Sequence, residues 1–481
     1  MSARRHACKV VVVGTGAGGA VAGAVLADAG IDTLLVEQGR RWEAGDHDDV
    51  IGAFSRMYLN GGITLTLGNP PIPLPLGCAV GGTTVINSST CFRPSEEKIA
   101  AWGGPSPAEL APCFAEVERR LNVHPEEEAV LGGNTRVMRR GCAALGVEIK
   151  PLSHNIKDCK GRGRCQYGCR EGAKQSTDVT FVPDALAAGA RLLTRHRVLN
   201  VLTRNGRAVG VSGVSPEGAF EIAADAVVLA LGALSTPAFL LRQGLGNASG
   251  RVGRGLTIHP AARVVAEFDE DVDGFNGLSQ AGYIDQWADR GVLLEGVFMP
   301  PGLLTASLPG TGQEYKDLAA AYRRLASFGI MVADTTTGRV LRGRLGNPFT
   351  AFYQLNRADA ESMRFGMARL AEIYLAAGAK RVFTNVQPMP FLRNRDELRR
   401  FETMPIRPSH LEMMAFHPLG TCAMGASPES SVVNYDLEAH DVGGLHVMDG
   451  SVVPASPGVN PQITIMGLAM RAAKNLAQTL L

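Results

Sequence analysis

A glycine-rich turn near the start of the chain constrains the fold more than any other feature. Residues 9–13 form a short apolar run that predicts a buried parallel strand, and Gly14, Gly16 and Gly19 follow it in the pattern G-x-G-x-x-G. The small residues at 20–29 then predict a helix. In such a turn the first glycine permits the tight bend, the second lets the backbone approach a pyrophosphate, and the third lets helix and strand pack closely. The pattern therefore predicts a Rossmann-like, dinucleotide-binding fold.

The next predicted strand, residues 33–36, ends at an acidic side chain, Glu37. A carboxylate at this position can accept hydrogen bonds from both hydroxyls of a ribose, and it would repel a 2′-phosphate. Glu37 therefore favours FAD or NAD over NADP. The turn and the carboxylate do not by themselves separate FAD from NAD.

Composition excludes several other classes of protein. With 45% hydrophobic and 20% charged residues, the 481-residue chain can bury a large core and is not a disordered protein. The formal net charge of +2 gives no general attraction to nucleic acid, and no stretch of roughly 20 apolar residues predicts an integral membrane segment. Arg4 and Arg5 precede too short an apolar run for a secretion signal. The nine cysteines do not suggest a disulfide framework, so we expect a cytoplasmic protein.

Three further segments carry a resemblance to a known family. They are residues 77–87 (GCAVGGTTVIN), residues 232–246 (GALSTPAFLLRQGLG), and residues 417–425 (HPLGTCAMG), the last continuing through residues 448–451 (MDGS) to residues 458–462 (GVNPQ). In this order and spacing they resemble the glucose–methanol–choline (GMC) oxidoreductases, from the first strand to the C-terminus. The resemblance is weak in the segment that precedes the third motif.

This resemblance implies an α/β fold in which a Rossmann-like FAD-binding domain is interleaved with an α+β substrate-binding domain. The substrate-binding domain would contain a large mixed or antiparallel sheet covered by helices. We expect the FAD-binding domain to be discontinuous, built from residues 1–264 and 406–481, with residues 50–76 and 92–185 partly forming lid or substrate-side insertions. Residues 265–405 would form the substrate-binding domain.

The resemblance also implies FAD as the cofactor, bound non-covalently because no histidine occupies residues 81–87, where some family members attach the flavin. Residues 194–214 predict a strand hairpin that would hold the adenine end of the cofactor near Val198. A helix predicted over residues 461–479 would point its N-terminus, with its free N–H groups, at the flavin ring. The cofactor-binding residues that we expect are Gly14, Gly16, Gly19, Glu37, Gly82, Thr83, Asn87, Val198, Gly232, Asp449, Gly450, Pro461 and Gln462.

Two polar residues of the C-terminal motifs are the candidate catalytic residues. By resemblance, His417 is the active-site histidine of the family and would act as the base that takes a proton from an alcohol. Asn460 matches a second position, which is histidine in some members and asparagine in others; it cannot act as a base but can hydrogen-bond the alcohol oxygen. From spacing alone, a buried structural histidine and a turn residue are the simpler interpretations. We expect His259 to be structural.

Three cysteines, Cys159, Cys165 and Cys169, lie in a glycine-rich segment with the spacing C-x5-C-x3-C. Some family members carry a three-iron cluster on three such cysteines, and related members without a known cluster also have cysteine-rich loops here. Ordinary thiols, with one disulfide at most, are the favoured interpretation, so we expect no metal site. Neighbouring lysine and arginine side chains are expected to lower the thiol pKa values.

The function that the resemblance implies is FAD-dependent oxidation of a small-molecule alcohol to an aldehyde or ketone, by hydride transfer to flavin N5 with His417 as base. A non-redox lyase or decarboxylase on the same flavoprotein scaffold is the alternative. Sterols, long-chain alcohols and sugar or aminosugar hydroxyls all stay open as substrates, as do oxygen and an electron-transfer acceptor as oxidants. Side chains that could line the substrate pocket, although core packing is the simpler use for each, are Tyr283, Trp287, Phe298, Met299 and Tyr353.

Overall fold

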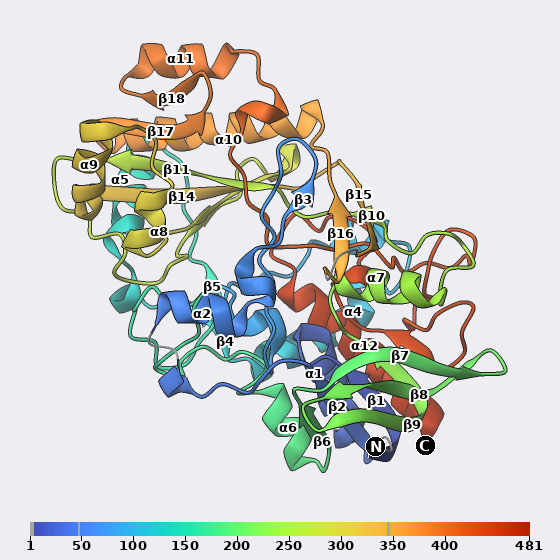
Figure 1. Ribbon diagram of the computed structural model, residues 1–481. Helices are drawn as coiled ribbons and strands as arrows, with labels where there is room; N and C mark the ends of the chain where they lie inside the picture. Colours follow the sequence, from blue (N-terminus) through green and yellow to red (C-terminus); the bar gives the residue numbers. More distant parts are fainter. Residues whose placement is uncertain (1–3, 47–48, 344–346) are drawn as a thin grey trace.

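The computed structural model describes residues 4–46, 49–343 and 347–481. Its two main sheets lie at opposite ends of the molecule, and both chain termini lie beside the lower one (Figure 1). The lower sheet has seven strands in the order β6-β2-β1-β9-β8-β7, with β19 paired to β9. Its strands are β1 (Arg4–Val13), β2 (Thr33–Glu37), β6 (Arg191–Thr194), β7 (Arg197–Arg204), β8 (Arg207–Ser215), β9 (Gly218–Leu229) and β19 (Leu445–Val447).

The strand–turn–helix that the glycine pattern predicts is present. β1 lies between β2 and β9, parallel to both, and α1 (Ala17–Asp28) follows the turn. β1 begins at Arg4, earlier than predicted, because the residues before the apolar run also pair with β9. The predicted hairpin is confirmed as β7 and β8, and its turn residues Asn205 and Gly206 both have positive φ, as a tight two-residue hairpin turn requires.

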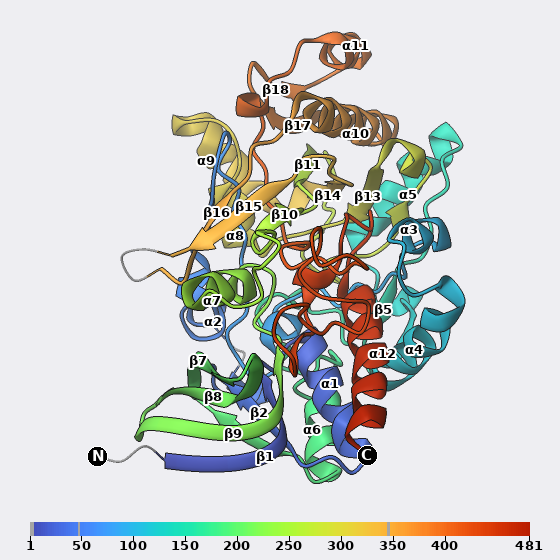
Figure 2. The same cartoon turned by 90° about the vertical axis from the view of Figure 1, so that its right-hand side faces the viewer.

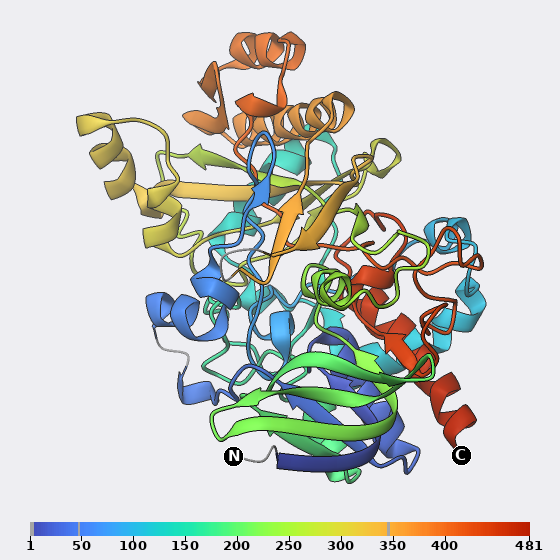
Figure 3. The same ribbon diagram turned by 45° about the vertical axis from the view of Figure 1, so that its right-hand side comes forward.

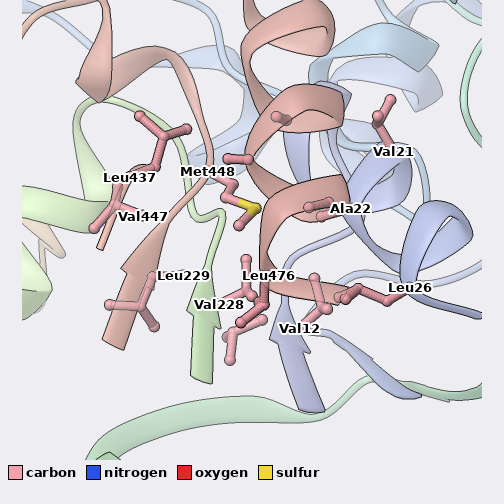
Figure 4. Close-up of a cluster of buried hydrophobic side chains, with 14 of the residues drawn as sticks. Val12, Val21, Ala22, Leu26, Val228, Leu229, Leu437, Val447, Met448 and Leu476 are labelled. Carbon is pink, nitrogen blue, oxygen red and sulfur yellow. The ribbon is translucent and has the colours of Figure 1, made fainter. Parts of the chain in front are cut away.

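The two ends of the chain fold together. The C-terminal helix α12 (Gln462–Leu480) confirms the predicted last helix and packs beside α1 (Figure 2). Figure 4 shows Leu476 of α12 next to Val228 of β9 within the buried apolar cluster beneath these helices. Gly18 of α1 lies so close to β19 that a Cβ there would be 1.9 Å from the carbonyl oxygen of Met448, so only glycine allows this approach.

The opposite end of the molecule contains a six-stranded antiparallel sheet of order β12-β13-β14-β11-β17-β18. α10 (Arg357–Ala376) and α5 (Gly133–Leu145) pack on one face of it, at the top of Figure 3. This confirms the expected sheet with its helical cover, and the other face lines the cavity described below. The strands are β11 (Ala261–Glu267), β12 (Tyr283–Ile284), β13 (Val292–Gly296), β14 (Leu325–Val332), β17 (Arg381–Val386) and β18 (Met389–Leu392).

Smaller elements connect the two ends. A four-stranded sheet has the order β10-β15-β16-β3, so that β3, from the predicted insertion 50–76, pairs with a strand of the predicted substrate-binding segment. The remaining strands are β3 (Thr66–Leu67), β4 (Val123–Pro125), β5 (Ser153–Asn155), β10 (Arg254–Leu256), β15 (Gly338–Arg342) and β16 (Phe349–Phe352). The remaining α-helices are α2 (Val50–Met57), α3 (Glu96–Ala101), α4 (Pro107–Arg120), α6 (Phe181–Ala187), α7 (Ser235–Gln243), α8 (Pro301–Ala306), α9 (Gly312–Ala320) and α11 (Arg395–Thr403). Among the helices of the described ranges, none combines the length and the apolar character that a bilayer-spanning segment needs.

Candidate active site

The carboxyl ends of three parallel strands meet beside the glycine-rich turn. The N–H of Ala230 donates to the carbonyl of Val13 (2.8 Å), and the N–H of Met448 donates to the carbonyl of Leu229 (2.8 Å). Gly14 has a φ of +102°, and a Cβ there would lie 2.3 Å from the carbonyl oxygen of Ala230. Ligands of open α/β sheets bind at this edge. The turns after β1, β9 and β19 therefore form one cradle.

Asp449 joins two of the sequence motifs within this cradle. One oxygen of its buried carboxylate accepts hydrogen bonds from the N–H of Gly232 (2.9 Å) and the hydroxyl of Thr236, and the other accepts from the N–H of Ser451 (2.8 Å). Burial raises the pKa of this carboxyl group, although the hydrogen bonds oppose the shift. Gly450 follows, also buried. Asp449 and Gly232, two predicted cofactor residues, thus lie together, and the carboxylate holds the two turns in place.

Gly16 and Gly82 pack closely against each other, since a Cβ built at Gly82 would lie 2.9 Å from the Cα of Gly16. The atom nearest to a Cβ built at Gly16 would be the Cα of Gly82, at 4.0 Å. Gly82 has a φ of +54° and begins the turn Gly82–Val85, in which the Thr83 hydroxyl accepts from the N–H of Gly77 (3.1 Å). Bare backbone on both sides, together with the N-terminus of α1, is the environment that a pyrophosphate requires.

Glu37 is 5% exposed at the end of β2, and its carboxylate is bonded to the glycine-rich turn. Oε2 accepts from the N–H (3.0 Å) and the hydroxyl (2.9 Å) of Thr15, and Oε1 accepts from the N–H of Gly39 (2.8 Å). The N–H of His196 donates to the Glu37 carbonyl (2.9 Å), which brings the start of β7, and with it Val198, to this edge. A carboxylate has about four acceptor positions, so the predicted ribose contact is compatible with these bonds.

The N-terminus of α12 contacts the segment 81–87 directly. The side-chain amide of Asn87 donates to Gln462 Oε1, and Gln462 Nε2 donates to Asn155 Oδ1 (3.2 Å). Pro461 immediately precedes the first helical residue. The first N–H groups of a helix have no partner within it, so those of α12 are available at this junction. Two predicted cofactor segments from opposite ends of the chain are therefore in contact.

His417 is hydrogen-bonded to a second histidine, His259. Their Nδ1 atoms are 3.1 Å apart and the rings meet at 82°. The backbone N–H of Gly458 donates to His259 Nε2 (3.2 Å), so His259 links His417 to the loop that carries Asn460. Burial lowers the pKa of His417 to about 4 and the pKa of His259 well below its ordinary value. Both rings are therefore neutral near neutral pH.

This series of hydrogen bonds determines where the protons lie. A backbone N–H can only donate, so His259 Nε2 is the acceptor and the proton of neutral His259 lies on Nδ1. His259 Nδ1–H then donates to His417 Nδ1, which leaves the proton of neutral His417 on Nε2. The nitrogen of His417 that does not contact His259 is therefore a hydrogen-bond donor.

Asn460 approaches a buried carboxyl group, Glu295 of β13. Burial raises the pKa of Glu295 to about 7, although hydrogen bonds from the side chains of Asn460 and Gln280 oppose the shift. Glu295 Oε2 and Asn460 Oδ1 are buried and have no hydrogen-bond partner among the described residues. Buried oxygens without a partner are rare in folded proteins. These two oxygens are therefore placed to bind a group that the polypeptide itself does not supply.

His259, His417, Glu295 and Gln280 line one cavity, whose remaining wall is largely apolar. Of the five pocket residues that the sequence suggested, Met299 lies in this wall, whereas Phe298 and Tyr353 belong to buried apolar clusters. The apolar side chains of the wall are Val297, Met299, Ile330, Met331, Met413, Met414 and Phe416.

Comparison with known proteins identifies the family. Family models described as GMC oxidoreductase match residues 54–261 and residues 338–469. An uncharacterised GMC-type oxidoreductase of Mycobacterium tuberculosis is 36% identical to the chain and is covered over 75% of its length by 96% of the chain. The chain belongs to the GMC oxidoreductase family.

Two further relatives extend the comparison. A long-chain-alcohol oxidase of Arabidopsis thaliana is 30% identical to this GMC oxidoreductase, with 99% of the chain and 68% of the relative covered. A structure of formate oxidase from Aspergillus oryzae is 16% identical, with a TM-score of 0.76 and all of both chains covered. The second similarity shows that the fold is shared.

FAD is the cofactor of this GMC oxidoreductase, and the cradle fits it. The bare backbone of Gly16 and Gly82 beside the N-terminus of α1, the N-terminus of α12, and the buried carboxylate of Glu37 lie along one edge of the nucleotide sheet. These features match the pyrophosphate, the flavin ring and the ribose, respectively. The contact of each predicted residue with FAD, and non-covalent attachment, stay predictions.

Lys174 connects the segment 81–87 to the cysteine-containing loop. Its Nζ donates to the carbonyl oxygens of Val85, Asn87 (3.0 Å) and Cys165 (2.7 Å), and its side chain is buried. Burial lowers the pKa of Lys174 to about 8. The ammonium group is therefore still mostly charged near neutral pH. Its three protons hold residues 85–87 against the cysteine-containing loop.

We expect Lys174→Met to lower the free energy of unfolding by about 3 kcal/mol or more and to weaken FAD binding, since three buried carbonyls lose their donor. Thermal unfolding and titration of the apoprotein with FAD would measure the two effects. Lys160→Met, at an exposed position of the same loop, is the matched control and should change neither quantity. A Lys174→Met protein that equals the control would show that this side chain does not couple the segments.

Cys159, Cys165 and Cys169 line a second cavity, with a volume of about 970 Å³. All nine cysteines are free thiols. Within the described ranges, no group of three or more histidine, cysteine, aspartate or glutamate side chains is arranged to hold a metal ion. The expectation of a lowered thiol pKa is wrong for Cys159: burial raises its pKa, and the nearby thiols of Cys165 and Cys169 raise it further.

Sequence reasoning missed three polar residues of the site: His259, Glu295 and Lys174. His259 has a positive φ of 49°, which is unusual for a histidine, but no sequence pattern reports this. Glu295 did carry a signal, because it interrupts an apolar run that forms a wholly buried strand. The contacts of Lys174 with residues 85 and 87 span long stretches of chain, which local patterns do not detect.

Proposed function

We propose that this GMC oxidoreductase oxidises an alcohol to an aldehyde or ketone. The observation that carries the proposal is a set of three polar atoms for which the described residues supply no hydrogen-bond partner: His417 Nε2–H and Glu295 Oε2, whose side chains line an apolar cavity, and Oδ1 of Asn460, whose side chain also bonds to Glu295. The Nε2–H donor and one of the two acceptors suit a hydroxyl group, which accepts hydrogen bonds and donates one. Bound FAD supplies the acceptor of a hydride at flavin N5.

The reaction balances as the loss of two electrons and two hydrogens from the alcohol. The O–H proton passes to a base of the protein, the hydrogen on the carbinol carbon leaves as hydride, and the carbon–oxygen bond becomes double. Oxygen or another electron acceptor then takes the two electrons. In this scheme His417 and Asn460 hold the alcohol oxygen and orient the carbinol carbon.

The hydrogen bonds of the histidine pair bear on which group acts as the base. His417 was predicted as the base, but in the neutral pair its Nε2 carries a proton and can only donate. Glu295 Oε2 offers a free lone pair in the same cavity, and a carboxyl pKa near 7 suits proton transfer at neutral pH. We therefore propose that Glu295 takes the proton and that His417 donates a hydrogen bond to the alcohol oxygen.

The pH dependence of flavin reduction distinguishes the two candidate bases. If Glu295 is the base, it must be ionised, so the rate should rise as pH rises through about 7. If His417 is the base, the rate should rise near pH 4 and be flat through 7, because burial lowers the His417 pKa to about 4. Stopped-flow rates across this range would decide, and Glu295→Gln should remove the rise near 7 if it belongs to Glu295.

Anaerobic mixing with alcohols tests the proposed function itself. A screen of primary, secondary and sugar alcohols should contain members that bleach the visible absorbance of the oxidised flavin and yield the matching carbonyl compound. A lyase or decarboxylase on this scaffold would convert its substrate without bleaching the flavin. Absence of bleaching by every alcohol class would contradict the proposal.

A further inference from the structure

The cavity that holds the proposed reaction contains one arginine, Arg263 of β11. Its Nε is buried without a hydrogen-bond partner among the described residues, and its Nη1 donates to the thioether sulfur of Met299 (3.3 Å). Burial lowers the pKa of the guanidinium, while the charge of Glu412 opposes the shift. Arg263 is half-buried, and a guanidinium whose buried Nε–H lacks a hydrogen-bond partner is costly for the fold. Its placement in this cavity therefore indicates a ligand group.

The register of the sheet separates this arginine from the reacting groups. Arg263 pairs with Gly329, and Gly329 pairs with Glu295 on the next strand, so that the three residues form one row across β11, β14 and β13. Residues in one row of an antiparallel sheet point to the same face, and two strand spacings amount to about 10 Å. Gly329 has no side chain of its own, and Val297 covers it: a Cβ built at Gly329 would lie 3.1 Å from Val297 Cγ1, so the floor between the glutamate and the arginine is apolar.

The wall between these two ends is suited to an apolar chain. It contains four methionines, Met299, Met331, Met413 and Met414, whose unbranched side chains adapt to irregular apolar ligands. Phe416 adds an aromatic side chain that is 42% exposed. A ligand that contacts both ends would therefore have a polar group at each end and hydrocarbon between them.

Glu412 is the carboxylate of the protein that could pair with Arg263 in place of a ligand. It is exposed, its Oε2 accepts from Asn385 Nδ2 (3.1 Å), and it forms no ion pair with Arg263 within the described residues. Glu412 lines the same cavity as Arg263, and Glu295 lies in the same row of the sheet as Arg263. The negative charges of these two carboxylates disfavour a doubly charged ligand group such as a phosphate. A single guanidinium matches a single carboxylate, and the pair can form two parallel hydrogen bonds.

We propose that Arg263 binds a carboxylate of the substrate, so that the preferred substrates are hydroxy acids with an apolar chain between the carbinol carbon and the carboxylate. This proposal rests on the proposed alcohol oxidation and adds the substrate class. Arg263 is thus a specificity-determining residue that does not take part in hydride or proton transfer.

Paired substrates and paired variants test this assignment. Anaerobic flavin reduction would be measured with ω-hydroxy acids of graded chain length, each against the alkanol of the same length, for the parental enzyme, Arg263→Met and Arg263→Lys. At the best chain length, the second-order rate constant of flavin reduction in the parental enzyme should favour the hydroxy acid by about 10- to 100-fold. This is the effect of one hydrogen-bonded charge pair. Arg263→Met should abolish that preference with alkanol reduction unchanged, and Arg263→Lys should retain part of it.

A binding measurement separates this inference from the proposed function. Dodecanoate, which cannot be oxidised as an alcohol, should bind the holoenzyme in calorimetry, and Arg263→Met should weaken its binding by about 10-fold or more. Glu412→Gln is the matched control and should not weaken it. If alkanols are reduced as well as hydroxy acids and dodecanoate binding ignores Arg263, the inference is wrong while alcohol oxidation survives. If no alcohol bleaches the flavin, the proposed function fails, and dodecanoate binding still decides whether Arg263 holds a carboxylate.

Discussion

Replacing His417 by alanine is expected to slow flavin reduction by alcohol by about 10² or more, with FAD still bound. The variant loses His417 Nε2–H, the N–H group that the His259–His417 pair leaves free to bond the alcohol oxygen. The negative charge that develops on that oxygen is then no longer stabilised. Stopped-flow rates at saturating alcohol, normalised to flavin content, would measure the effect. A variant that reduces its flavin at the parental rate would remove His417 from the mechanism.

His417→Gln is the matched variant that separates the two roles of this residue. A glutamine amide retains an N–H donor but has no basic nitrogen. If His417 donates a hydrogen bond, His417→Gln should reduce its flavin clearly faster than His417→Ala. If His417 is the base, the two variants should be equally slow.

Replacing Gly16 by valine is expected to give a folded protein that is purified without flavin. Gly16 has ordinary negative φ (−68°), so its backbone accepts any L-residue, and a Cβ there meets no protein atom closer than 4.0 Å. The valine side chain would instead project beside Gly82 from the backbone where we place the pyrophosphate. Absorbance of the purified protein and FAD titration of the apoprotein would measure the loss.

The control for Gly16→Val is the same substitution at Gly302 in α8, which also has open space and no positive φ. Gly302→Val should keep its flavin. Thermal unfolding of both apoproteins should show that neither substitution unfolds the chain. If Gly16→Val retained flavin with parental affinity, the pyrophosphate would have to lie elsewhere.

Local patterns predicted the nucleotide end of the molecule well, for a physical reason. The strand, turn and helix of β1 and α1 depend on neighbours within a few residues, because Gly14 needs its positive φ and Gly19 its close packing. The β7–β8 hairpin is equally local, since its two turn residues set the register. That the last helix points its N-terminus at the flavin ring was predicted only from the family resemblance, and its contact with Asn87 was not predicted.

The polar surroundings of His417 could not be predicted in the same way. His259, the partner of His417, lies 158 residues earlier in the chain. Glu295 reaches Asn460 from β13, which is also far from Asn460 in the sequence. Such contacts depend on how β11, β13 and β14 pack beside the C-terminal loop. A single sequence shows that a buried glutamate is costly but not which side chain compensates it. The proton positions in the histidine pair required the Gly458 N–H, which only the structure reveals.

Hydride transfer from the carbinol carbon is the central claim, and deuterium at that carbon tests it most directly. Anaerobic single-turnover reduction would be compared for an alcohol that reduces the flavin and for the same alcohol fully deuterated at its carbinol carbon. For a primary alcohol, we predict that the deuterated substrate reduces the flavin more slowly and yields an aldehyde that keeps one deuterium. Equal rates at saturating alcohol, or a carbonyl product formed without flavin reduction, would contradict the claim.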